Sequence, residues 1–241
     1  MASIDYIRSV TRNILDKDGH GWIGDNKFNN ILTLAQDEVF NDIYSMYTMA
    51  LAMKTRNLEF GGFKYSGIDQ IVDDLKPLKR NGVSLTQITD NKFSYPSDYR
   101  YFVSLGYKDK AVDILKDTDN RNAILNSVVS PTERYPAARL NYNEVVLYPT
   151  TITADVEMDY YKNPRGVDAN GNPVNQSPTW AYTVVNGKSI YNPSASIQPE
   201  LPESTYNKII VRILSMYGIN IREMEVVQYA NNEEVKNRQN Q

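Results

Sequence analysis

Three acidic residues alternate with apolar ones in the middle of the chain: Asp155, Glu157 and Asp159. On a β-strand this alternation places all three carboxylates on one face, with successive carboxylates roughly 6.6 Å apart. Carboxylate pairs about 5–9.5 Å apart hydrolyse glycosides, so the spacing is compatible with that chemistry. Nothing in the pattern separates an acid from a base, and exposed acids on a strand are usually a solvated face. We therefore expect no catalysis from these residues.

The segment from Asp16 to Lys27 begins like the calcium-binding loop of an EF-hand. Asp16 and Asp18 stand at the first and third positions, and Gly21 stands at the sixth. At the twelfth position an EF-hand has a glutamate that closes the coordination sphere. Here that position is Lys27, whose ammonium group would repel the ion. We expect a glycine-rich turn between two helices and no tight calcium binding.

Composition limits the remaining chemistry. The 241-residue chain has no cysteine, which excludes thiolate nucleophiles, thiolate metal ligands and disulfides, and His20 is its only histidine. It has no G-x-S-x-G, Walker or H-E-x-x-H motif. With 26 basic and 29 acidic side chains the net charge is −3, without the basic excess of proteins that hold nucleic-acid phosphates. We expect a protein that is not an enzyme and uses no cofactor and no metal.

The first ten residues do not resemble a secretory signal, because Asp5 and Arg8 interrupt the apolar run that such a signal needs. No stretch of the sequence is long and apolar enough to span a membrane. The sequence therefore predicts a protein made in the cytoplasm, with no membrane partner.

Helical periodicity marks both ends of the chain. It predicts helices over residues 2–15, 26–55 and 68–75, and a helical segment that begins near Pro202 and ends at Gly218. The last segment carries large apolar residues at spacings of three and four: Tyr206, Ile209, Ile210, Ile213, Leu214 and Tyr217. Burial of each is worth roughly 1.5–3 kcal/mol, so this stripe must face a core or a neighbouring subunit.

Between the helical ends the apolar period changes to two, which indicates β-strands. Candidate strands cover residues 93–107, 111–115, 140–148, 151–161, 179–185 and 188–191. Asn186-Gly187 between the last two is a strong hairpin signal, because both turn residues tolerate positive φ.

These elements predict an α+β fold in which helical N- and C-terminal segments pack together around an inserted β-rich middle, as an antiparallel sheet or a sandwich. We expect a single domain over residues 1–241. Its helical part covers 1–80 and 200–241, and the β-rich insertion covers 90–195.

A series of short sequence motifs occurs in a fixed order over nearly the whole chain. They are Gly21-Trp22-Ile23, Lys27-Phe28-Asn29, Ala35-Gln36-Asp37-Glu38-Val39-Phe40, Tyr95-Pro96-Ser97-Asp98-Tyr99, Pro131 with Tyr135-Pro136, Val146-Leu147-Tyr148-Pro149, Tyr160-Tyr161-Lys162-Asn163-Pro164 and Glu200-Leu201-Pro202. In this order they resemble a family of virion proteins of tailed bacteriophages, especially the crAss-like phages.

The resemblance implies a noncatalytic structural subunit that forms a ring in the neck, or head–tail connector, between portal and tail. Such a subunit assembles in the host cytoplasm and resides in the virion. Its partners would be itself, in a homo-oligomeric ring of about twelve copies, the portal protein and neighbouring neck or tail proteins. DNA would pass through the channel without specific contacts, which suits a net charge of −3.

Two further expectations accompany this interpretation. An abundance of tyrosine, 18 residues against 6 phenylalanines, is typical of surfaces that are partly apolar and partly polar, as in assemblies. If the ring surrounds DNA, the acidic face of Asp155, Glu157 and Asp159 could line the channel and repel phosphates. An outer solvated face is the alternative.

Two other functions remain open from the residues. The β-rich middle could be a carbohydrate-binding or hydrolysing tail module that uses exposed aromatics with Asp155 and Glu157. Asp16 and Asp18 could instead belong to a calcium-dependent interaction module.

Overall fold

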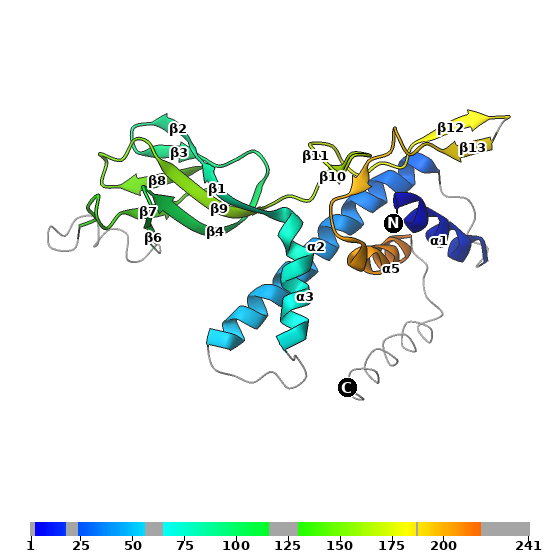
Figure 1. Ribbon diagram of the computed structural model, residues 1–241, viewed down its shortest axis with the longest axis horizontal. Helices are drawn as coiled ribbons and strands as arrows, with labels where there is room; N and C mark the ends of the chain where they lie inside the picture. Colours follow the sequence, from blue (N-terminus) through cyan, green and yellow to red (C-terminus); the bar gives the residue numbers. More distant parts are fainter. Residues whose placement is uncertain (1–2, 18–23, 56–64, 116–129, 187, 218–241) are drawn as a thin grey trace. The chain divides into compact units, whose positions relative to one another are not determined.

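The computed structural model describes residues 3–17, 24–55, 65–115, 130–186 and 188–217 (Figure 1). It combines helices with antiparallel and mixed sheets, which confirms the α+β class. The chain divides into two compact units: Met1–Pro77 with Pro164–Gln241, and Leu78–Asn163. This division differs from the predicted β-rich insertion over 90–195, because residues 164–199 belong to the helical unit.

The helices of the first unit agree closely with the sequence prediction. The long helix runs from Asp25 to Thr55, where 26–55 was predicted, and the N-terminal helix begins two residues later than predicted. The helical elements are α1 (Ile4–Lys17), α2 (Asp25–Thr55), α3 (Tyr65–Leu75), the 3-10 turns η1 (Lys76–Leu78) and η2 (Glu203–Thr205), and α5 (Tyr206–Met216). The sequence after Gly218 carries a similar apolar stripe at Ile221, Met224 and Val227, which predicts a second helical segment or a continuation of the first, and these residues lie outside the described residues.

Within this unit α5 packs against α1 and α2, and α3 packs against α2. The buried side chains of α1, α2 and α5 form its core: Ile4, Ile7, Leu15, Phe28, Leu32, Val39, Phe40, Ile43, Ile209 and Ile213. Their three- and four-residue spacing explains why the periodicity in the sequence located these helices correctly.

Two small sheets complete the first unit. Three short strands pair in the order β11 (Pro173–Val174), β10 (Gly166–Val167) and β14 (Gln198–Pro199). The other sheet is the hairpin of β12 (Tyr182–Val185) and β13 (Lys188–Tyr191), in which Val185 pairs with Lys188. This register confirms the predicted hairpin. Asn186 has the positive φ, 50°, that the turn requires, and Gly187 lies outside the described residues.

A buried polar junction joins α2 to both ends of the segment that carries these strands. The Gln36 side chain is fully buried; its Nε2 donates to the Arg165 carbonyl at 2.9 Å, and its Oε1 accepts from the Glu200 backbone N–H at 3.2 Å. Glu200 Oε2 accepts from the Arg165 N–H at 3.0 Å. Buried polar groups require such partners, so this junction fixes where the segment leaves the helices and returns.

The second unit contains two sheets that enclose one core. One sheet has the order β1 (Lys79–Ser84), β9 (Val156–Lys162), β4 (Tyr99–Tyr107) and β5 (Lys110–Ala111). The other has the order β2 (Thr86–Thr89), β3 (Lys92–Ser94), β8 (Glu144–Tyr148), β7 (Ala137–Leu140) and β6 (Asp113–Ile114). All described pairs are antiparallel except β6 with β7. Phe93, Val145 and Leu147 from one sheet pack with Leu105 and Met158 from the other, as in a sandwich.

Two of the sequence motifs that carry the family resemblance are joined by hydrogen bonds. The Tyr160 hydroxyl donates to Asp98 Oδ1 at 2.7 Å, and the Asn163 N–H donates to the Asp98 carbonyl at 2.7 Å. Burial and the hydrogen bond to Asp98 raise the pKa of Tyr160 well above its ordinary value. Both motifs therefore have a structural role, because hydrogen bonds link Tyr95-Pro96-Ser97-Asp98-Tyr99 to Tyr160-Tyr161-Lys162-Asn163-Pro164.

Candidate interaction site

The three predicted acids do not form one face of a strand. Glu157 and Asp159 lie on β9, but Asp155 precedes the strand with φ of 56°, and its carbonyl accepts a hydrogen bond from the Lys108 N–H. The left-handed conformation turns the chain before the strand begins, so the prediction was wrong for Asp155. Its exposed carboxylate lies 4.0 Å from the Lys108 ammonium group.

Asp159 has a local structural role. Its Oδ1 accepts from the Gly82 N–H at 2.7 Å, and its Oδ2 accepts from the Ser104 hydroxyl at 2.7 Å. Gly82 has φ of 61°, inside the register irregularity between Arg80 and Val83 of β1. Asp159 therefore links β9 to both neighbouring strands, and only Asp155 and Glu157 of the predicted set are exposed acids.

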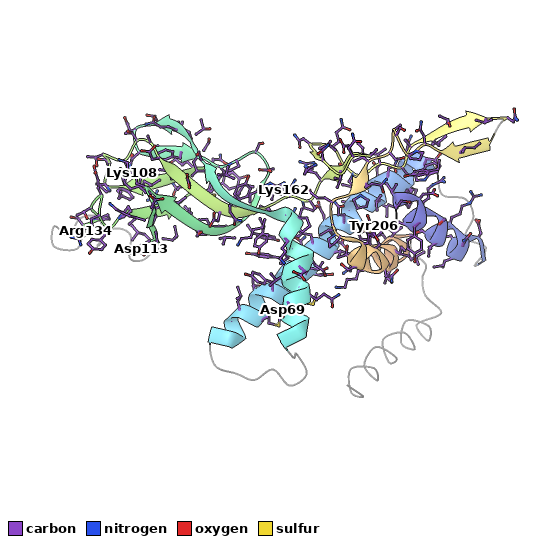
Figure 2. The ribbon with its side chains drawn as sticks, viewed as in Figure 1. Asp69, Lys108, Asp113, Arg134, Lys162 and Tyr206 are labelled. Atoms are coloured by element: carbon purple, nitrogen blue, oxygen red, sulfur yellow. The ribbon has the colours of Figure 1, made fainter. Side chains whose placement is uncertain are left out.

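The predicted apolar stripe on α5 faces the core of its own unit. Tyr206, Ile209, Ile210 and Ile213 are buried, and Leu214 and Tyr217 are half-buried. Tyr206, at the start of α5, is labelled in Figure 2. Burial raises the pKa of Tyr206 to about 12. The sequence left open a core or a subunit contact for this stripe, and these four side chains occupy the core.

The segment that resembles an EF-hand loop is described only at its two ends, and residues 18–23 lie outside the described residues. Asp16 Oδ2 lies 3.4 Å from Arg12 Nε, and Asp25 forms an ion pair with Arg8. The Lys27 ammonium group lies 4.8 Å from the centroid of the Tyr217 ring. Among the described residues, no group of three or more acidic or histidine side chains gathers as metal ligands would.

Trp180, just before the β12–β13 hairpin, is almost completely buried, with 3% of its surface exposed. Its backbone N–H and carbonyl both bind the Asn29 side-chain amide of α2, at 2.8 and 3.3 Å. Its indole Nε1 donates to Asp5 Oδ1 at 2.9 Å, and the Arg8 guanidinium lies 3.4 Å above the ring. Trp180 thus holds the start of the hairpin against α1 and α2.

Aromatic and amide contacts hold the rest of the hairpin base. The rings of Tyr182 and Tyr191 stack with the Trp180 ring at centroid distances of 5.5 and 6.1 Å. Gln198 Oε1 accepts from the Ile4 N–H at 2.7 Å, and its Nε2 donates to the Tyr191 hydroxyl at 3.1 Å. Sequence reasoning missed this anchor because its partners lie more than 150 positions apart along the chain.

Beyond this base the hairpin exposes apolar side chains on both faces. We call residues 182–191 the arm. Strand alternation and the cross-strand pairs place Val184 on the face of Tyr182 and Tyr191, and Val185 with Ile190 on the opposite face. The exposed fractions are 64% for Val184, 48% for Val185 and 50% for Ile190. A two-stranded hairpin is marginally stable alone in water, and exposed apolar patches mark interaction sites.

Comparison with known proteins places the chain in no family: no protein-family model and no curated protein matches its sequence. In the part of the chain that the structure describes, none of the helices combines the length and the apolar character needed to cross a membrane.

A pocket of about 460 Å³ lies at the base of the arm, lined by polar side chains of α1 and by Trp180, Ser189 and Tyr191. Its charged residues balance, because Arg8 and Arg12 are matched by Asp5 and Asp16. A sugar site would need an open aromatic face. The Arg8 guanidinium covers a face of the Trp180 ring, so that face is closed to a sugar in this pocket. Asp155 and Glu157, on which the carbohydrate alternative rests, are not among the residues that line it.

Proposed function

We propose that this protein is a noncatalytic structural subunit of a phage virion, forming a ring in the neck between portal and tail around the DNA channel. The observation that carries the proposal is the arm, which exposes apolar side chains on both faces yet is firmly anchored at its base. An anchored apolar hairpin is suited to contact another protein and unsuited to remain in water.

In this proposal the helices α1, α2 and α5 pack together and hold the arm in a fixed direction. A ring requires heterologous contacts, in which one surface of each subunit meets a different surface of the next. A hairpin fixed at its base and apolar beyond it has the properties of one such surface. The portal protein and the neighbouring neck or tail proteins would contact the ring from above and below.

Purified protein should form rings of about twelve copies, visible by negative-stain electron microscopy and countable by mass photometry. Val184→Asp combined with Ile190→Asp should abolish the rings, because two carboxylates cannot be buried unpaired in the contact. Ile88→Asp is the matched control, an exposed residue on β2 of the other unit, and should leave rings intact. A monomeric wild-type protein, or rings that survive both arm substitutions, would contradict the proposal.

For the channel we propose that Asp155 and Glu157, the exposed acids of the predicted set, repel the DNA phosphates as the DNA slides past. Asp155→Lys with Glu157→Lys should leave ring formation unchanged and lower the free energy of unfolding by less than about 1 kcal/mol, because the ion pair of Asp155 with Lys108 is exposed. The double variant should impair DNA ejection from particles, because lysines bind phosphates through counterion release. Asp159→Lys should instead lower the free energy of unfolding by about 1–2 kcal/mol, because it removes two hydrogen bonds that are weakened by exposure to water. Normal ejection by the double variant would show that these acids do not line the channel.

A further inference from the structure

Four polar side chains gather on the outer face of the five-stranded sheet in the second unit. Lys92 of β3 and Arg139 of β7 both pair with Val146, one on each side of β8. Glu144 lies two positions before Val146 on β8, so strand alternation places its side chain on the same face. Asn141 follows the end of β7 and reaches this face through hydrogen bonds to Arg139 and Glu144.

The Glu144 carboxylate holds a lysine amine and an asparagine amide together. Lys92 Nζ donates to Glu144 Oε1 and Oε2 at 3.1 and 3.2 Å, and Asn141 Nδ2 donates to the same Oε1 at 3.1 Å. The two nitrogens are therefore neighbours through one oxygen atom. The hydrogen bonds from Lys92 and Asn141 lower the pKa of Glu144, so its carboxylate is ionised and able to accept a proton.

The amide of Asn141 is polarised from its other side. Arg139 Nε donates to Asn141 Oδ1 at 2.8 Å, and only this orientation of the amide offers the guanidinium an acceptor and the carboxylate a donor. The backbone of Asn141 is fixed as well, because its N–H donates to the Glu144 carbonyl at 2.9 Å and its carbonyl accepts from the Tyr95 hydroxyl at 3.0 Å. A donor held at a carbonyl oxygen stabilises the negative charge that develops there when a nucleophile attacks the carbon.

We propose that Lys92 and Asn141 form an intramolecular isopeptide bond, with Glu144 as the proton carrier. Glu144 takes a proton from the Lys92 ammonium group, and the lone pair of Nζ attacks Cγ of Asn141 while Arg139 stabilises the oxyanion. As the bond from Cγ to Nδ2 breaks, Glu144 returns its proton to Nδ2 and takes the second proton that Nζ releases. That proton passes to the departing ammonia, so the products are one amide bond and one ammonium ion. Fixed proximity of the two groups replaces a collision in solution.

The bond joins β3 to the turn between β7 and β8 and closes a covalent loop over the intervening chain. In a chain without cysteine it supplies the constraint that a disulfide supplies elsewhere, because a closed loop leaves the unfolded chain fewer conformations. The inference concerns the second unit alone and does not depend on the proposed ring.

The test is the intact mass of the purified wild-type protein after prolonged incubation at neutral pH. The mass should be lower than that calculated from the sequence by one ammonia. A tryptic digest should contain a branched peptide that joins Lys92 to Asn141, because trypsin does not cleave after an acylated lysine. Lys92→Arg keeps a positive charge beside Glu144 but lacks the nucleophilic amine, so it should have the full calculated mass. Glu144→Gln removes the proton carrier and should also have the full mass.

The matched control is Lys108→Arg, because Lys108 also lies beside a carboxylate, that of Asp155. This variant should still lose one ammonia. A wild-type protein of full mass would overturn the proposal, and a branched peptide in Glu144→Gln would overturn the role of Glu144. A loss of ammonia that persists in Lys92→Arg would also overturn it, because an asparagine before a glycine can lose ammonia by cyclising on the backbone. None of these results alters the expected outcome of the ring assay.

Discussion

Replacement of Ile213 by alanine should lower the free energy of unfolding by about 2–5 kcal/mol. Ile213 is fully buried on α5, in a core where α5 packs against α1 and α2. Its removal loses apolar burial and leaves a cavity between helices that are distant in sequence and cannot close it fully. Urea denaturation followed by circular dichroism measures the change.

The matched control is Val211→Ala on the same helix. Val211 lies two positions away and is 60% exposed, so its loss should change stability by less than about 0.5 kcal/mol. This pair separates the burial of the stripe from the helix propensity of alanine, because both variants gain the same residue. A loss below about 1 kcal/mol for Ile213→Ala would place that side chain outside the core and contradict the packing of α5.

The sequence located those elements whose signal is local. The periodicity of three and four predicted α1, α2 and the stripe on α5, since each helix buries one face within a few turns. The hairpin was predicted from Asn186-Gly187, because its turn chemistry is contained in two residues.

Features that depend on distant contacts could not be predicted in the same way. Asp155 was assigned to a strand because alternation does not reveal a left-handed residue at the start of that strand. The sequence did not predict that the second unit ends at Asn163. The next residues return to the first unit through the hydrogen bonds of Gln36 with Arg165 and Glu200, which lie 129 and 164 positions from it along the chain. For the candidate site, the hairpin itself was predicted, but neither its anchor at Trp180 nor the exposure of its apolar side chains was.

Replacement of Trp180 by alanine should have the second large effect, on stability and on assembly together. The variant loses a buried indole that contacts Asp5 and Arg8, so we expect the free energy of unfolding to fall by about 3–5 kcal/mol. The stacking of Tyr182 and Tyr191 against the ring is lost as well, and with it the fixed direction of the arm. Under conditions where the variant remains folded, mass photometry should show monomers in place of rings.

Trp180→Phe tests the hydrogen bond of the indole N–H separately from the aromatic contacts of the side chain. Phenylalanine keeps an aromatic face for Arg8 and the two tyrosines but loses the hydrogen bond from Nε1 to Asp5 Oδ1. A single lost hydrogen bond to a carboxylate should cost about 1.5–3 kcal/mol, and the arm should still direct ring formation because its aromatic base persists. A closed ring requires each subunit to hold its neighbours at a fixed angle. Rings in Trp180→Ala at wild-type abundance would therefore contradict the role of the indole in fixing the direction of the arm.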